Sequence, residues 1–136
     1  MCIFCQIVKK EIPANVVYED DLVMAFLDIR PLNPGHTLVI PKKHYRWVWD
    51  IEEFEEYGVA VKKIANVLKK TLGTDYVVSL VFGEEVPHAH TWLIPRFEND
   101  GHGGAIDLNN VKSISKEEMD EVAGKIRRGF AGILQD

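Results

Sequence analysis

Two histidines stand two positions apart in the segment VPHAHTWLIP, residues 86–95. If this apolar segment is a strand, His88, His90 and Trp92 share one face, because side chains alternate across a strand. Imidazole can act near neutral pH as a nucleophile, an acid, a base or a metal ligand. The pair is therefore a candidate for catalysis or metal binding, although two partly buried histidines bonded to backbone carbonyls would have the same spacing.

The two cysteines of the chain, Cys2 and Cys5, form a C-x-x-C pair. This is the spacing of a zinc half-site, in which two thiolates bind one tetrahedral ion. A redox-active pair and a chance spacing are the alternatives, and the flanking residues do not have the βαβ pattern that accompanies thioredoxin-like redox pairs. Two cysteines do not make a disulfide framework, so we expect a reducing compartment, most simply the cytoplasm.

Length and composition favour one soluble globular domain over residues 1–136, with 46% apolar and 27% charged residues. The net charge of -5 gives no general attraction to large nucleic acids or to anionic lipid, although a small nucleotide could still bind in a pocket. No apolar run reaches the roughly 18 residues that would span a bilayer. The first apolar residues precede the lysines, so we do not expect a signal peptide.

The elements that would position these residues are short strands and two helices. Consecutive strands joined by short turns favour an antiparallel sheet, so the sequence predicts an α+β domain with about five strands. The expected strands cover residues 16–18, 22–27, 36–40, 76–82 and 86–94, the last two joined by a hairpin at 83–85.

Both expected helices have apolar residues at helical spacing after a capping signal. The first follows Asp50 and Glu53, which together predict a capping box, and Gly73 suits its end. The second follows Ser115 and Glu118, a further capping box, and runs toward the end of the chain.

Four segments, in this order, resemble the histidine triad (HIT) superfamily. They are the C-x-x-C pair, F-L-D-I at 26–29, P-G-H-T-L-V-I-P-K-K-H at 34–44, and the H-x-H pair followed by L-I-P-R. The resemblance covers residues 1–96 well and the C-terminal helix only in general terms. It implies a nucleotide-binding fold that works as a homodimer, with a sheet and two helices in each subunit.

The resemblance also implies an activity. Enzymes of the superfamily hydrolyse or transfer nucleoside monophosphates from phosphoramidates, dinucleoside polyphosphates and related compounds. The second motif histidine, here His90, attacks the α-phosphate and is transiently nucleotidylated, which divides one displacement into two easier steps. His36 matches the histidine beside this site, where it could donate a hydrogen bond to the phosphate, although without the resemblance a turn histidine after Gly35 is the favoured interpretation. The expected partner is a purine nucleotide or another nucleoside monophosphate derivative.

Asp28 and Ile29 match the position where the superfamily binds the nucleoside. There Asp28 would accept hydrogen bonds from the ribose hydroxyls, and Ile29 would lie against the base. Phe26 would line the base pocket, or simply fill the core. Without the resemblance, Asp28 could equally cap a turn after the apolar run.

The resemblance implies a structural zinc ion as well. Superfamily members with the N-terminal cysteine pair complete the site with two histidines, one after the P-G-H strand and one that begins the motif. The matching residues are His44 and His88, beside Cys2 and Cys5. A closed site of four protein ligands has no open position for a substrate, so the zinc would stabilise the fold and take no part in the reaction.

The motif departs from the superfamily at Trp92, where its third histidine stands. An indole has one N–H donor and no acceptor, so Trp92 cannot take up or release a proton at neutral pH. As a substrate-binding residue it could stack on a ligand or fill the leaving-group side. Residues 82–87 replace a longer loop of many HIT hydrolases, and Glu84 and Glu85 are expected at its solvent-exposed tip.

Three functions therefore fit the sequence. The first is a HIT-type hydrolase or nucleotidyl transferase. The second is a nucleotide-binding protein with little or no turnover, favoured by Trp92. The third is a zinc-stabilised dimeric interaction module, in which Asp28 and His36 would have no evident purpose. His102, in a glycine-rich loop, is expected to be exposed.

Overall fold

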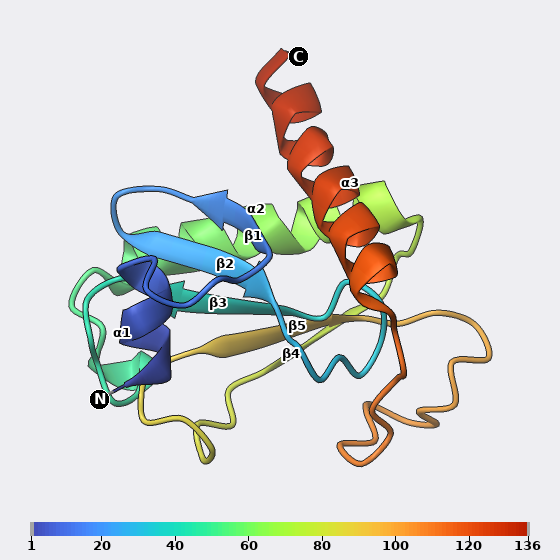
Figure 1. Cartoon of the computed structure of the whole chain (residues 1–136), viewed down its shortest axis with the longest axis horizontal. Helices are drawn as coiled ribbons and strands as arrows, with labels where there is room; N and C mark the ends of the chain where they lie inside the picture. Colours follow the sequence, from blue (N-terminus) through green and yellow to red (C-terminus); the bar gives the residue numbers. More distant parts are fainter. Residues whose placement is uncertain (1, 136) are drawn as a thin grey trace.

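Five short apolar segments form one antiparallel sheet in the computed structural model, which describes residues 2–135 (Figure 1). In this sheet Leu38 pairs with Phe26 on one side and with Trp92 on the other, and every neighbouring pair of strands is antiparallel. The α+β fold with five strands is confirmed. The strands, in the spatial order β1–β2–β3–β5–β4, are β1 (Val16–Glu19), β2 (Val23–Leu27), β3 (Thr37–Pro41), β4 (Val77–Leu80) and β5 (Thr91–Pro95).

Helices cover both faces of the sheet. The two long helices pack on one face and the short α1 on the other (Figure 1). All of β2 is buried for this reason, since alternate side chains face the long helices and α1 in turn. None of the described helices has the length and apolarity needed to cross a membrane. The helices are α1 (Ile3–Val8), α2 (Phe54–Leu72) and α3 (Lys116–Gln135), and a 3₁₀ turn, η1 (Val48–Asp50), precedes α2.

Two of the expected helix signals are confirmed. At α3, the Ser115 Oγ accepts a hydrogen bond from the Glu118 N–H at 3.1 Å, as a capping box requires. At the end of α2, Gly73 has a φ of 68°, the left-handed conformation that favours glycine.

The capping box predicted at the start of α2 is wrong. The helix begins at Phe54, and its first flanking residue, Glu53, makes no side-chain capping hydrogen bond. The Asp50 carboxylate is engaged one turn earlier, where it accepts from the Trp47 N–H at 3.2 Å and closes η1.

The short helix α1 has no counterpart among the elements that the sequence predicts. Its first turn is capped by Cys2, whose Sγ accepts from the Cys5 N–H at 3.4 Å. Phe4 and Ile7 are buried on the sheet face that includes Phe26. Six residues are too few for a stable isolated helix, so packing on the sheet is what stabilises α1.

The strand that follows the histidine pair begins later than predicted. It starts at Thr91 and not at Val86, so residues 81–90 form an irregular connection in place of the expected turn at 83–85, although β4 and β5 do pair as the predicted antiparallel hairpin. Within this connection the Ala89 N–H donates to the Tyr45 carbonyl at 2.7 Å, which ties it to the segment after β3. The backbone before β5 therefore takes its position from neighbours outside the expected hairpin.

A buried ion pair holds the long loop between β5 and α3. The Nε of Arg96 donates to the Asp100 carboxylate at 2.7 Å, and its other nitrogens donate to carbonyls of residues 103–105. This guanidinium holds the pKa of Asp100 well below its usual range. The expectation that His102 is exposed is wrong, because its Nε2 donates to the Leu32 carbonyl at 2.6 Å from a buried position in this loop.

Candidate functional site

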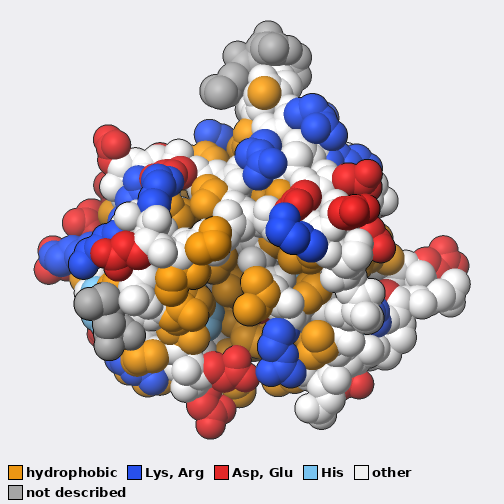
Figure 2. Space-filling view, in the orientation of Figure 1, with side chains coloured by type: hydrophobic (Ala, Val, Ile, Leu, Met, Phe, Trp, Pro, Cys, Tyr) orange, Lys and Arg blue, Asp and Glu red, His pale blue; other side chains and the backbone are white. Residues whose placement is uncertain are grey.

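A cavity of about 320 Å³ opens on the sheet face that α1 covers. It lies between α1, the end of β2 and the start of β5, and Figure 2 shows hydrophobic side chains gathered around a hollow on this side of the molecule. Its volume is in the range of small-molecule sites. The residues predicted for catalysis and substrate binding that line it are Phe26, Asp28, Ile29, His90 and Trp92.

His90 lines this cavity with one of its imidazole nitrogens unprotonated. Its Nδ1 donates to the His88 carbonyl at 2.7 Å. Because a carbonyl oxygen only accepts, Nδ1 carries the proton and Nε2 keeps a free lone pair. Burial lowers the pKa of His90 below its ordinary value, so the ring is neutral at pH 7. The ring meets Phe4 edge-on with 5.2 Å between centroids, which fixes its orientation.

His36 lies behind the cavity wall and does not line it. Its ring is buried, and Nδ1 accepts from the Leu32 N–H at 3.0 Å, so the proton is on Nε2. That Nε2 lies 3.6 Å from the Asp28 carboxylate, beyond hydrogen-bond distance, and has no partner among the described residues. The ring also contacts Trp92, with 5.0 Å between centroids. His36 thus supports two residues of the cavity.

We expect the His36 imidazole to stay neutral down to about pH 4. Burial lowers its pKa to about 3, with a smaller contribution from His102. The unfolded chain takes up this proton near pH 6.5, so the stability that the buried neutral ring provides is complete above about pH 6.5 and falls by about 1.4 kcal/mol per pH unit below it. NMR titration should show an unprotonated Nδ1 from about pH 7 to about pH 4.5. A midpoint near pH 6.5 would contradict the burial of this ring.

Asp28 and its neighbours form one wall of the cavity. Oδ1 of Asp28 accepts from the Arg30 N–H at 2.8 Å, so this residue does cap a turn. Its Oδ2 faces His36, and burial raises the pKa of the carboxyl group. Ile29 is 89% exposed at the rim, whereas Phe26 is buried and meets Phe4 edge-on at 5.4 Å between centroids. The wall therefore combines a carboxylate, an exposed aliphatic side chain and an aromatic floor.

Trp92 forms another part of the lining. Its ring lies near His36 and near Phe82, with 5.0 and 6.1 Å between centroids. Its Nε1 is buried and has no hydrogen-bond partner within residues 2–135. The indole has one N–H donor and no acceptor, so it supplies no titratable proton near neutral pH.

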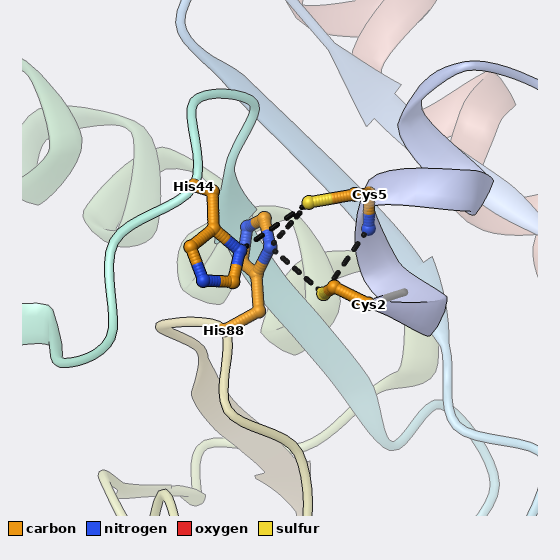
Figure 3. Close-up of side chains that lie close together, drawn as sticks. All are labelled: Cys2, Cys5, His44 and His88. Carbon is orange, nitrogen blue, oxygen red and sulfur yellow. Dashed lines mark hydrogen bonds between the residues drawn. The ribbon is translucent and has the colours of Figure 1, made fainter.

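A second group of predicted residues comes together at the N-terminal end of α1 (Figure 3). Cys2 and Cys5 belong to this end of the helix, while His44 follows β3 and His88 precedes β5. Their four ligand atoms all lie within 4.8 Å of one another. The Cys5 Sγ lies 3.3 Å from the His44 Nδ1 and 3.5 Å from the His88 Nδ1, and the Cys2 Sγ lies 3.4 Å from the His88 Nδ1.

These separations fit a single tetrahedral ion. With Zn–S near 2.3 Å and Zn–N near 2.0 Å, tetrahedral geometry places a sulfur and a nitrogen about 3.5 Å apart. The His88 Nε2 donates to the Pro41 carbonyl at 2.8 Å, which leaves Nδ1, the nitrogen that faces the sulfurs, free of a proton. The cluster could therefore hold a metal ion, and its four protein ligands leave no open coordination position.

The cavity also has lining residues that the sequence does not assign to it. Glu84 and Glu85 are both exposed, as predicted, but Glu85 also lines the cavity, which the sequence does not indicate. Leu108 and Val111 line it from the loop before α3. That loop is placed by contacts of Arg96 with residues several positions away, a relationship that no local pattern reveals.

Known proteins align with this chain over nearly its full length. The HIT domain family profile matches residues 9–99. A HIT-like protein of Methanocaldococcus jannaschii is 47% identical over 134 residues, which cover 93% of this chain and 99% of that protein. The adenosine 5′-monophosphoramidase of Saccharomyces cerevisiae is 34% identical over 136 residues, covering 90% and 84%. The adenylylsulfatase of Arabidopsis thaliana is 32% identical over 145 residues, covering 99% and 72%.

The fold is shared as well. A zinc-bound histidine triad family protein from Mycobacterium smegmatis superimposes with a TM-score of 0.81 at 29% identity, covering 98% of this chain and 96% of that one. The matched profile, the relatives and the common fold agree with one another. The chain belongs to the HIT family.

Proposed function

We propose that the protein is a nucleotide hydrolase or nucleotidyl transferase that cleaves at the α-phosphate of a nucleoside phosphoramidate or a dinucleoside polyphosphate. The observation that carries the proposal is His90, a neutral imidazole with an unprotonated Nε2 in the same cavity as the Asp28 carboxylate. Relatives named adenosine 5′-monophosphoramidase and adenylylsulfatase support this reaction class.

The chemistry follows from the state of the His90 ring. In the first step the Nε2 lone pair forms a bond to the α-phosphorus, and the bond from phosphorus to the leaving group breaks. An amine leaving group keeps that electron pair and takes a proton from water. The ring retains its Nδ1 proton. The hydrogen bond from this N–H to the His88 carbonyl stabilises the positive charge of the nucleotidylated imidazole. In the second step water attacks the phosphorus, the electron pair returns to Nε2, and a proton goes to solvent as the nucleoside monophosphate leaves.

The wall at the end of β2 suits a purine nucleoside. The apolar surfaces of Phe26 and Ile29 would contact the base, and Asp28 would accept hydrogen bonds from the ribose hydroxyls. His36 is a positioning residue in this proposal, because its Nε2–H faces Asp28 and its ring contacts Trp92. Trp92 would bound the leaving-group side of the cavity.

Asp28→Asn is expected to weaken AMP binding by about tenfold, since a charged acceptor for the ribose hydroxyls is lost. The same variant should bind 2′,3′-dideoxy-AMP as the wild type does, because that nucleotide has no ribose hydroxyl to donate. Calorimetric titration of both nucleotides checks this. An equal loss of affinity for the two nucleotides would mean that Asp28 acts through the turn that it closes with the Arg30 N–H and does not contact the ribose.

Zinc is the metal that we propose for the cluster of Cys2, Cys5, His44 and His88. Thiolate and imidazole donors are the ligands that zinc prefers, and a family member of the same fold is zinc-bound. The ion would fix α1 against the strands and would hold His88, whose carbonyl accepts from the Nδ1 of the proposed nucleophile. Its role would be structural.

A homodimer is part of the same proposal. Strand β4 is at one edge of the five-stranded order, so its outer backbone groups are available to a second copy. Trp49 and Phe54 form an exposed aromatic pair at the start of α2, with 6.2 Å between ring centroids, and Val59 is 67% exposed on the same helix. Multi-angle light scattering would measure the mass in solution directly.

Trp92 favours a second candidate function, a nucleotide-binding protein with little or no turnover. Within the cavity lining, this side chain cannot protonate a leaving group. The test is to mix the purified protein with adenosine 5′-phosphoramidate and to follow AMP release, while measuring AMP binding in parallel. Release of AMP supports the enzyme, whereas saturable AMP binding without release supports the binding protein. If neither AMP release nor AMP binding is observed, the zinc-stabilised interaction module is the function that remains.

A further inference from the structure

The charges around the cavity bear on the kind of leaving group that the site accepts. Its described lining has two acidic side chains, Asp28 and Glu85, and one basic side chain, Arg30. Arg30 acts on Asp28: its backbone N–H bonds the carboxylate and its charge lowers the pKa of that group. The charge of Asp28 is thus partly balanced within the cavity.

Glu85 is not balanced in this way. No Lys or Arg side chain within residues 2–135 forms an ion pair with it. Arg46, which lines the adjoining cavity together with Glu85, forms no ion pair with it, although its positive charge opposes the negative charge of Glu85 at the His90 ring. Its guanidinium donates to the Gly83 carbonyl at 2.9 Å and lies 3.7 Å from the centroid of the Trp47 ring.

Glu85 lies on the lining of the cavity that holds the reacting group. It belongs to the connection that leads into β5, and it lines the same cavity as His90 and Trp92. Its field also reaches the nucleoside wall: burial is the first cause of the raised pKa of Asp28, and the negative charge of Glu85 adds to it. A group that leaves the α-phosphate at His90 therefore departs within the field of this carboxylate.

We propose that Glu85 selects substrates whose leaving group carries a positive charge over substrates whose leaving group is anionic. The inference rests on the proposed function, because it concerns the group displaced by His90. A carboxylate attracts an ammonium group and repels a sulfate, a carboxylate or a second phosphate. Since Glu85 is exposed and screened by solvent, the discrimination that one charge provides at this rim is about tenfold.

Three adenosine 5′-phosphoramidates with the same P–N bond test the proposal. Their amines are 2-aminoethylamine, propylamine and 3-aminopropanoate, which make the far end of the leaving group cationic, neutral and anionic. The values of kcat/KM are measured for the wild type, for Glu85→Gln and for Glu84→Gln. Glu84 is the matched control, since it is the adjacent exposed glutamate and does not line the cavity.

In the wild type, kcat/KM is expected to decrease from the cationic to the neutral to the anionic substrate. Glu85→Gln should reduce the ratio of cationic to anionic by about tenfold, and Glu84→Gln should change it by less than about twofold. The neutral substrate corrects for any general loss of activity. Salt near 0.5 M should also reduce the wild-type ratio, because the interaction is screened.

The role of Glu85 would be overturned if Glu85→Gln and Glu84→Gln had the same cationic-to-anionic ratio of kcat/KM. A wild-type preference for the anionic substrate would overturn it as well. If none of the three compounds is cleaved, the proposed hydrolase fails separately. The same charge preference is then measured from their dissociation constants, in which Glu85→Gln should again reduce the cationic-to-anionic ratio and Glu84→Gln should not.

Discussion

Replacing His90 with alanine is expected to lower the rate of AMP release from adenosine 5′-phosphoramidate by about 10⁴-fold or more. The side chain supplies the atom that forms the new bond to phosphorus, and within residues 2–135 the cavity lining holds no other imidazole. His36 is buried behind the wall and its one unprotonated nitrogen accepts from the Leu32 N–H, so it cannot take over. Steady-state rates on matched preparations measure the loss.

Two measurements separate loss of the nucleophile from loss of the fold. AMP should bind the His90→Ala variant within about threefold of the wild type, since the nucleoside wall at the end of β2 is untouched. His90→Gly leaves space where added imidazole can act, so imidazole should restore a measurable rate to this variant. A His90→Ala variant that keeps more than about a tenth of the wild-type rate would contradict the assignment.

Removing the metal should have the largest effect on stability. With zinc present at about 1,000 times its dissociation constant, binding to the folded chain alone contributes about 4 kcal/mol to the free energy of unfolding. Chelation, or the substitution Cys5→Ser, is expected to remove this contribution and to lower Tm by about 10 °C or more. The wild type should contain one zinc ion per chain by elemental analysis, and Cys5→Ser should contain little.

The matched comparison for this prediction is the chelated wild type beside the chelated Cys5→Ser variant. The two should unfold at nearly the same temperature, because the hydrogen-bond partners of the Cys5 thiol, His44 and His88, are members of the cluster. If chelation leaves the wild-type Tm unchanged, the four residues do not hold a stabilising ion. A lower pH should weaken metal binding in the wild type, since the ligand atoms must be free of protons.

Much of the fold can be predicted because the signals are local. Strand-length apolar runs mark β1, β2 and β3 within one or two residues, and the Ser115 box marks the start of α3. The grouping of four side chains that could hold a metal ion is also predicted, from the C-x-x-C pair and the motif resemblance, even though Cys2 and His88 are far apart in the chain.

The rest depends on contacts between distant segments. Helix α1 is stabilised by packing of Phe4 and Ile7 on the sheet, which no capping signal reports. The late start of β5 follows from backbone bonding to Tyr45, and a periodic apolar pattern cannot show it. The burial of His102 depends on its hydrogen bond to the carbonyl of Leu32, which is 70 positions earlier in the chain. The composition of the loop alone therefore suggests an exposed residue. The place of Glu85 in the cavity lining likewise depends on how distant segments pack together.

Detection of the covalent intermediate on His90 is the most direct test of the proposed reaction. Wild-type protein is mixed with adenosine 5′-phosphoramidate, quenched within milliseconds to seconds, and analysed by intact and peptide mass spectrometry under conditions that preserve P–N bonds. We expect an adduct of one adenosine monophosphate moiety that forms and decays as AMP appears, and that maps to the peptide containing His90. AMP release with no adduct at any time, or an adduct on another residue, would contradict it.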